Sequence, residues 1–133
     1  MVGEQPIPSA TESAVANAQA WFAAHHRGSL PTQLVDFWGT TNGISLNGTS
    51  LWAAEETNDI SGVVETNVLY VDEFPELFCL GNADDVWMYA YRPAAGTYEI
   101  VATHGFDQVD RTFDSFDELA THILGQAITS VNL

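Results

Sequence analysis

The stretch VWMYAYRPAAGTYEIVA, residues 86–102, decides the fold class of this chain. In its first part, Val86–Tyr91, aliphatic and aromatic side chains alternate, so both faces of the predicted strand carry apolar groups. This pattern is typical of a central strand that is covered on both sides. Residues 93–96 read as a turn, and Thr97–Ala102 reads as the returning strand of a β-hairpin.

Two helices are predicted at the N-terminal side of this hairpin. Ser9 and Glu12 match the capping box of the first helix, and Gly28 follows its last turn, where a left-handed residue ends many helices. Pro31 opens a second, shorter helix, because the first position of a helix does not need an amide proton. Asn42-Gly43 ends this second helix.

A third helix is predicted close to the C-terminus. Ser115 and Glu118 form another capping box, which precedes an apolar stripe with helical spacing. The stripe consists of Phe116, Leu119, Ala120, Ile123 and Leu124. Helices at both ends and strands between them predict an α+β fold with a mixed, mostly antiparallel sheet. We expect one domain over residues 9–133, preceded by a flexible arm over residues 1–8.

The middle of the chain gives a weaker pattern. Ile44–Glu55 favours β structure, with a tight turn at Asn47-Gly48. Residues 56–73 are polar and mixed, and they predict no more than a short helical turn beside an apolar run. Leu77–Leu80 reads as a buried strand that Gly81-Asn82 ends.

The charge of the chain restricts its partners. The 133 residues include 18 acidic and 3 basic ones, which gives a formal net charge of −15, and none of the basic residues is a lysine. This composition excludes a Schiff-base or P-loop lysine, and it argues against binding to nucleic acid or to an anionic membrane. It favours a basic partner, although acidity can also serve solubility or salt adaptation alone.

The sequence also predicts where the protein works. Cys79 is the single cysteine, so no disulfide can form within the chain. The N-terminal residues lack the charge and apolar core of a signal peptide, and no apolar stretch is long enough to span a membrane. We therefore expect a cytoplasmic protein.

Several short motifs, in this order, resemble the SUKH superfamily of Smi/Knr-like domains. They are Leu30-Pro31, Asp36-Phe37-Trp38, Thr41-Asn42-Gly43, Phe78-Cys79-Leu80-Gly81-Asn82, Asp85–Tyr91 and Phe113–Leu119. The resemblance covers residues 30–124 and implies an α+β domain without known catalytic residues. In bacteria such domains resemble immunity proteins that neutralise a cognate toxin, often a nuclease, and in fungi they resemble regulators of cell-wall synthesis. The chain departs from the family pattern in its lack of lysines and in its short middle segment.

Signatures of catalysis are absent from the sequence, so we expect no enzyme, no cofactor and no metal site. The chain lacks the glycine-rich, zinc-protease, paired-cysteine and serine-hydrolase motifs. Cys79 and His104 form the one cysteine–histidine pair to consider, but Cys79 lies in a predicted buried strand. His25-His26 and His122 are better explained as capping and surface residues than as zinc ligands. Four aspartates flank Arg111 without the spacing of a calcium loop.

The candidate partner-binding residues combine acidic clusters with aromatic residues of the predicted strands. They are Trp52, Glu55, Glu56, Asp59, Asp84, Asp85 and Tyr89. Carboxylates would pair with the cations of a basic partner, and exposed Trp and Tyr are frequent binding hot spots. Two alternatives stay open: the acidic clusters are only solvated loops, and the aromatic residues are core beneath a helix.

We expect a non-enzymatic immunity protein that binds and blocks a cognate basic toxin, such as a nuclease. The alternative is a regulatory or scaffold domain with an endogenous protein partner. Neither the partner nor the oligomeric state follows from the sequence.

Overall fold

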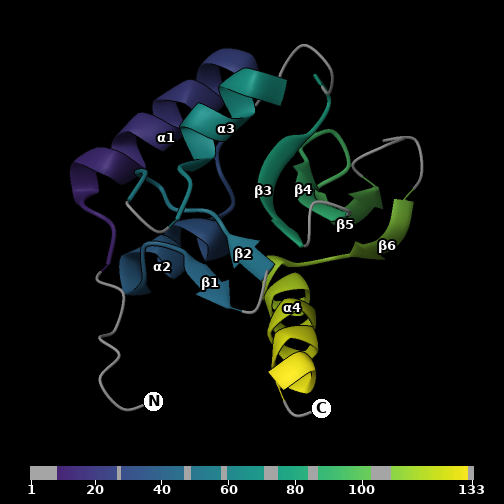
Figure 1. The fold of residues 1–133 in the computed structure, drawn as a ribbon. Coiled ribbons are helices and arrows are strands. Elements are labelled where there is room, and N and C mark those ends of the chain that lie inside the picture. Colours follow the sequence, from purple (N-terminus) through teal and green to yellow (C-terminus); the bar gives the residue numbers. More distant parts are fainter. Residues whose placement is uncertain are drawn as a thin grey trace.

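The computed structural model describes residues 9–26, 28–46, 49–57, 60–70, 75–83, 87–102 and 109–131. These residues form an α+β fold, as predicted (Figure 1). The helices are α1 (Glu12–His25), α2 (Thr32–Thr40), α3 (Val63–Tyr70) and α4 (Phe116–Val131). The strands are β1 (Ile44–Leu46), β2 (Thr49–Leu51), β3 (Phe78–Ala83), β4 (Trp87–Arg92), β5 (Thr97–Ala102) and β6 (Val109–Phe113).

The strands form one six-stranded sheet in which each strand pairs with the next one along the chain. All of these pairs are antiparallel, and the parallel element is a single bridge between Ala53 and Gly62. The predicted hairpin is β4–β5, with Arg92 opposite Thr97 and with Gly96 at a φ of 70° in the turn. Positive φ favours glycine there because it has no β-carbon.

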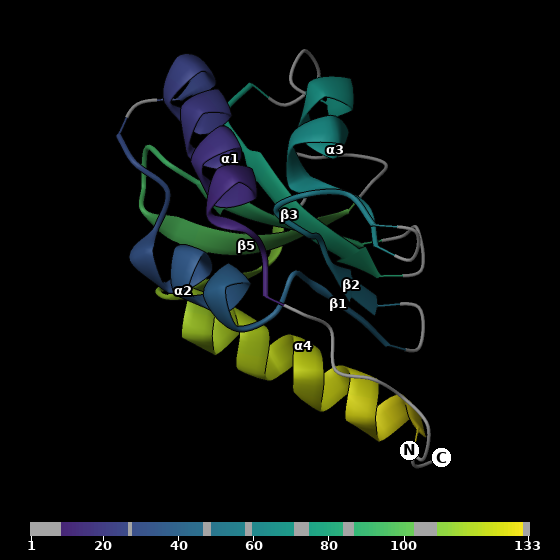
Figure 2. The ribbon, with the colours of Figure 1, turned by 90° about the vertical axis from the view of Figure 1, so that its left-hand side faces the viewer.

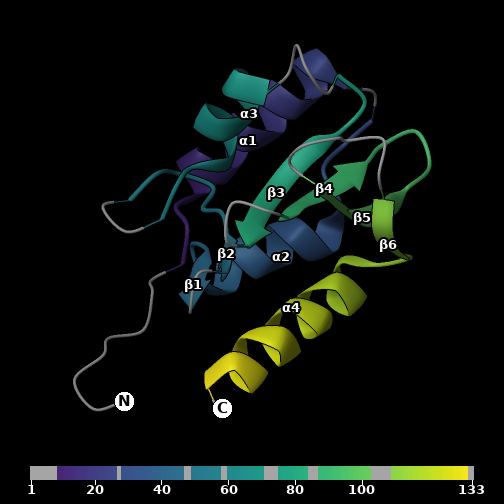
Figure 3. The same ribbon diagram turned by 45° about the vertical axis from the view of Figure 1, so that its right-hand side comes forward.

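The helices cover the sheet in pairs. α1 lies beside α3, and α2 lies beside α4 (Figures 2 and 3). Phe22 of α1 packs edge-on against Phe78 at a centroid distance of 5.1 Å and also contacts Tyr91 of β4. The sheet face that carries Tyr89 and Tyr91 therefore lies under α1 and belongs to the core.

The second helix pair closes the same core. Phe116, the first residue of α4, contacts Phe37 of α2 at 5.4 Å and Tyr98 of β5 at 6.0 Å between ring centroids. Trp38 and Leu119 are completely buried between these elements. Burial of aromatic rings of this size supplies a large part of the stability of a small domain.

Four local predictions need correction. Thr11 caps α1, because its hydroxyl accepts a hydrogen bond from the amide of Ala14 at 3.0 Å, so the cap lies two residues after Ser9. β3 continues through Gly81-Asn82, which pair with Tyr89 and Met88 of β4 after a register shift between Cys79 and Gly81. β6 was not predicted from the sequence. The short helical turn expected within residues 56–73 is the longer helix α3.

Gly81 continues the strand because the neighbouring strand passes very close to it. A β-carbon at Gly81 would collide with the carbonyl oxygen of Ser50 and lie 3.0 Å from Cα of Leu51. Glycine is required here by close backbone approach, not by a chain break. The arm over residues 1–8 and the turn at Asn47-Gly48 lie outside the described residues.

Candidate functional site

The aromatic residues of the expected binding patch lie in the core. Trp52 and Tyr89 each expose 5% of their surface, and the indole Nε1 of Trp38 donates to the carbonyl oxygen of Trp52 at 3.1 Å. Both residues point into the region that the helices cover, so they offer no surface to a partner. Their large apolar area explains this placement, since the interior of a small domain needs it.

The acidic residues of that patch have a different outcome. Glu55 and Glu56 are exposed, directly after the buried residues Ala53 and Ala54. Asp59, Asp84 and Asp85 lie outside the described residues, so their predicted role stays a prediction.

The side chain of Asn42 fixes the backbone that carries Glu55. Its Oδ1 accepts from the amide of Ala54 at 2.9 Å, and its Nδ2 donates to the carbonyl oxygen of Glu55 at 3.0 Å. Asn42 is itself buried, at 8% exposure, so these bonds are protected from competition with water. Asn42 therefore fixes the backbone at Ala54-Glu55 through one amide donor and one carbonyl acceptor.

A parallel bridge joins this segment to the start of α3. The amide of Ala53 donates to the carbonyl oxygen of Ser61 at 2.9 Å, and the amide of Val63 donates to that of Ala53 at 2.7 Å. Gly62 lies at the crossing, where an added β-carbon would meet the Glu65 carboxylate and lie 2.9 Å from the amide nitrogen of Glu56. Glu65 and Glu56 are thus neighbours in space. We call Glu55, Glu56 and Glu65 the acidic corner.

Asn67 determines which side of α3 faces water. Its side-chain amide makes the two hydrogen bonds that the backbone of a neighbouring strand would make. Nδ2 donates to the carbonyl oxygen of Cys79 at 2.8 Å, and Oδ1 accepts from the amide of Cys79 at 2.8 Å. This contact satisfies the part of β3 that β2 does not reach, since β2 pairs only with Gly81–Ala83. Side chains three and four residues apart are neighbours on a helix surface, so Val68 and Leu69 both lie next to Glu65. Glu65 and Leu69 lie on the side opposite Asn67, and Val68 flanks that side. We call these three residues the outer face of α3.

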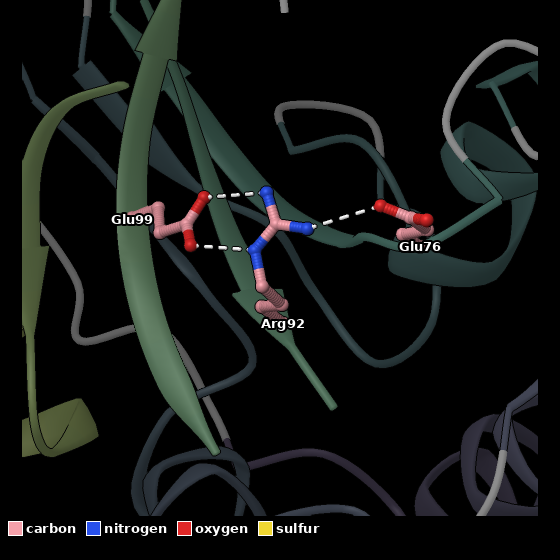
Figure 4. A network of polar contacts seen from close by, with 3 residues as sticks. All are labelled: Glu76, Arg92 and Glu99. Atoms are coloured by element: carbon pink, nitrogen blue, oxygen red, sulfur yellow. Dashed lines mark hydrogen bonds and ion pairs between the residues drawn. The ribbon is translucent and has the colours of Figure 1, made fainter. Parts of the chain in front are cut away.

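A second group of carboxylates is bound within the molecule. Arg92 forms two parallel bonds to Glu99, at 2.6 Å from Nε and 3.0 Å from Nη2, and a third to Glu76 at 3.2 Å (Figure 4). The side chain of Glu99 is 7% exposed and that of Glu76 is 80% exposed. The hydrogen bond to Glu99 is the main reason that the pKa of Arg92 is raised. All of its strong interactions are internal, so Arg92 is a structural cation.

A groove of about 370 Å³ adjoins this network, and it was not predicted from the sequence. It is lined by His25, His26, Pro75, Glu76, Arg92, Pro93 and Ala94. His25 stacks on Trp21 at 4.0 Å, and its Nδ1 lies 2.9 Å from the carbonyl oxygen of Trp21. Burial against aromatic rings lowers the pKa of His26, and the neighbouring His25 lowers it further.

The polar groups that line the groove are poorly suited to binding an anion or to acid–base catalysis. Its guanidinium is already held by two carboxylates, and His26 is neutral at pH 7 because its pKa is depressed below 6.5. The Nε2 atom of His26 is buried and has no hydrogen-bond partner among the described residues. A neutral, desolvated imidazole beside a paired arginine is neither an anion site nor a general-base arrangement with a positioned partner.

A shallower hollow of about 550 Å³ lies between β6 and α4, lined by Phe113, Asp117, Glu118, Thr121 and His122. The predicted cap at Ser115 is here: Ser115 Oγ accepts from the amide of Glu118 at 3.2 Å. The Glu118 carboxylate accepts in return from the amide of Asp114 at 3.0 Å, one residue before the position expected for a capping box. Burial lowers the pKa of His122. These polar groups serve mainly to start α4.

Cys79 has the properties predicted for a core residue. It is completely buried, and burial raises the pKa of its thiol to about 12. A thiol with this pKa is not a nucleophile at neutral pH. His104, its possible partner, lies outside the described residues.

Within the described ranges, no three His, Cys, Asp or Glu residues are grouped so that they could hold a metal ion. None of the helices there has the length and apolar character needed to cross a membrane. Neither a family model nor a curated protein matches the chain.

Proposed function

We propose that this protein is a non-enzymatic binding domain that docks a basic polypeptide, in the manner of an immunity protein that blocks a cognate toxin. The observation that carries the proposal is the exposure of its carboxylates. In the described part of the chain, every Asp and Glu except Glu99 is exposed, whereas Arg111 is the one exposed arginine. Among the described residues, exposed carboxylates therefore greatly outnumber exposed cations, and of these carboxylates Glu76 is the one with an ion pair to an arginine.

A surface of this kind favours association with a positively charged molecule. A field of one sign speeds the encounter with an oppositely charged partner, and the effect weakens as salt screens it. The acidic corner adds a fixed position, because Asn42 and the Ala53–Gly62 bridge hold its backbone. Carboxylates on a rigid backbone can pair with arginines and lysines with less loss of entropy on binding.

The immunity role rests on the resemblance of the motifs to SUKH domains and on this charge. A toxin that grips nucleic acid presents cations, and a strongly acidic protein can cover those cations and exclude the substrate. The mechanism is occlusion, so it needs no catalytic group on this chain.

The test begins with capture of partners from the host lysate and elution at rising salt. A supporting result is one basic polypeptide that stops growth when expressed alone and permits growth when expressed with this chain. Its association rate with the purified protein should fall at least about tenfold between low and high ionic strength. Recovery of housekeeping proteins only, with no growth effect, would move the assignment to a regulatory domain.

Paired variants locate the effect. The triple variant E55Q/E56Q/E65Q removes the acidic corner, and E12Q/D36N/D110N removes three exposed carboxylates from α1, α2 and β6 as a control with the same change in charge. We expect the first to slow association several-fold more than the second at low salt. Equal slowing by both variants would show general steering by net charge without a specific corner.

A further inference from the structure

The outer face of α3 exposes large apolar side chains. Leu69 is 73% exposed and Val68 is 55% exposed, the two highest values among the exposed large hydrophobic residues described. They are adjacent on one helix, whereas the other two, Trp87 at 36% and Val109 at 42%, lie on β4 and β6. Single exposed apolar residues are ordinary. Val68 and Leu69, however, follow Glu65 by three and four residues, so both lie next to Glu65 on the surface of the helix.

The exposure follows from how α3 is anchored. Val63 is completely buried, and Asn67 bonds to both backbone groups of Cys79, so the helix cannot rotate without losing buried contacts. Because the helix is anchored in this orientation, the side chains of Val68 and Leu69 are exposed to solvent. Figure 1 shows α3 beside α1, at the side of β3.

The charge around this patch limits what can cover it. Glu65 shares the outer face with Val68 and Leu69, and Glu65 lies next to Glu56 across Gly62. A second copy of this chain would bring Glu65 against an identical patch or against a surface with the same net negative charge. A basic occupant instead pairs its cations with the acidic corner while its apolar side chains cover Leu69.

We infer that the outer face of α3, together with the acidic corner, is the docking surface for an amphipathic basic segment of the partner. This inference rests on the proposed function and assigns its interface. Leu69 and Val68 form the desolvated centre, and Glu65, Glu55 and Glu56 form the charged margin, which is the usual anatomy of a binding hot spot.

The probes are two synthetic peptides of 18 residues with equal positive charge. One is an amphipathic helix of leucine and lysine, and the other replaces each leucine with serine. Binding to the purified protein is measured by isothermal titration calorimetry at low and at raised salt. We expect the leucine peptide to bind at least about tenfold more tightly, because it alone can cover the apolar centre.

Variants assign the site. L69S and V68S remove the apolar centre, and V109S is the matched control, because Val109 is an exposed valine outside the proposed surface. We expect L69S to weaken the leucine peptide about tenfold, V68S somewhat less, and V109S less than twofold. E65Q should weaken both peptides at low salt and have little effect at raised salt. Far-UV circular dichroism should stay unchanged in all four variants, since these side chains face water.

The outcomes separate the two proposals. If the serine peptide binds in a salt-dependent way and the leucine peptide binds no better, the docking surface is wrong and the proposed function stands. If neither peptide binds, both are wrong. If L69S and V109S have equal effects, the apolar contact lies elsewhere. Sedimentation that shows a dimer of the wild type and a monomer of L69S would assign the patch to a second copy and overturn the inference.

Discussion

The Glu76–Arg92–Glu99 network and the acidic corner both contain carboxylates, but only the network also contains a cation that pairs with them. Glu99 is buried, and Arg92 satisfies it with two parallel hydrogen bonds. Glu55, Glu56 and Glu65 are exposed, and their fixed backbone holds them out to water. Glu99 is therefore paired inside the fold, whereas the three carboxylates of the acidic corner are accessible to a partner. The difference can be tested by removing charges from each.

The largest effect is expected when Arg92 is lost. R92M leaves the Glu99 carboxylate buried without its cation, and breaking a pair of this kind destabilises a protein by about 3 kcal/mol. Urea unfolding measures the loss. The double variant R92M/E99M should recover most of it, because the unpaired charge is gone. E76Q is the control and should change stability by less than about 1 kcal/mol, since Glu76 is 80% exposed. Equal effects of R92M and E76Q would contradict the distinction between buried and exposed partners.

The next effect concerns the anchor of α3. N67A removes the bonds to the amide and the carbonyl of Cys79 and leaves both groups without a partner on that edge of β3. We expect a loss of about 2 kcal/mol, because unsatisfied buried backbone groups are unfavourable. Hydrogen exchange should locate the change: the Cys79 amide should exchange faster than it does in the wild type. Unchanged protection of this amide would show that α3 is not held by Asn67.

A smaller effect depends on pH. The folded pKa of His26 lies below its unfolded value of 6.5, so the unfolded chain takes up a proton more readily when pH falls. This contribution is absent above pH 6.5 and lowers stability below it, by at most about 1.4 kcal/mol per pH unit for one proton. The stability of H26F minus that of the wild type should therefore increase between pH 7 and pH 5. A constant difference would mean that the pKa of His26 is the same in both states.

The smallest effect is expected at the acidic corner. E55Q/E56Q/E65Q should alter the free energy of unfolding by less than about 0.5 kcal/mol, in the stabilising direction at low salt, because it relieves repulsion on the surface. Chemical denaturation at two salt concentrations measures this. A loss above about 1 kcal/mol would give these carboxylates a role in folding and weaken their assignment to a partner.

The sequence predicted the parts of the fold whose signals are local. The β4–β5 hairpin, the cap at Ser115 and the burial of Cys79 follow from alternation, spacing and flanking residues, and the structure confirms them. β6 was missed because its residues Val109–Thr112 are all exposed, so an edge strand there carries no apolar alternation.

The site could be predicted only in part, for physical reasons that can be named. Glu55 and Glu56 are exposed as expected, but the aromatic residues Trp52 and Tyr89 are buried. The sequence did not predict that α3 lies beside Glu55 and Glu56, because the polar residue Asn67 interrupts the apolar pattern on the buried side of this helix. Its partner is the backbone of Cys79, twelve residues later, and such a contact leaves no trace in local periodicity.

The serial order of the sheet also determines how the molecule can form. Each strand pairs with its neighbour in sequence, and β3, β4, β5 and β6 follow one another over short connections, so this part of the sheet can grow one hairpin at a time. β2 and β3 are instead separated by a longer connection that contains α3. α1 differs from the strands because its contacts are distant in sequence. Phe22 can pack against Phe78 and Tyr91 only after β3 and β4 have formed. During synthesis the N-terminal helix therefore leaves the ribosome without its packing surface, and it docks after the hairpins it covers have been made.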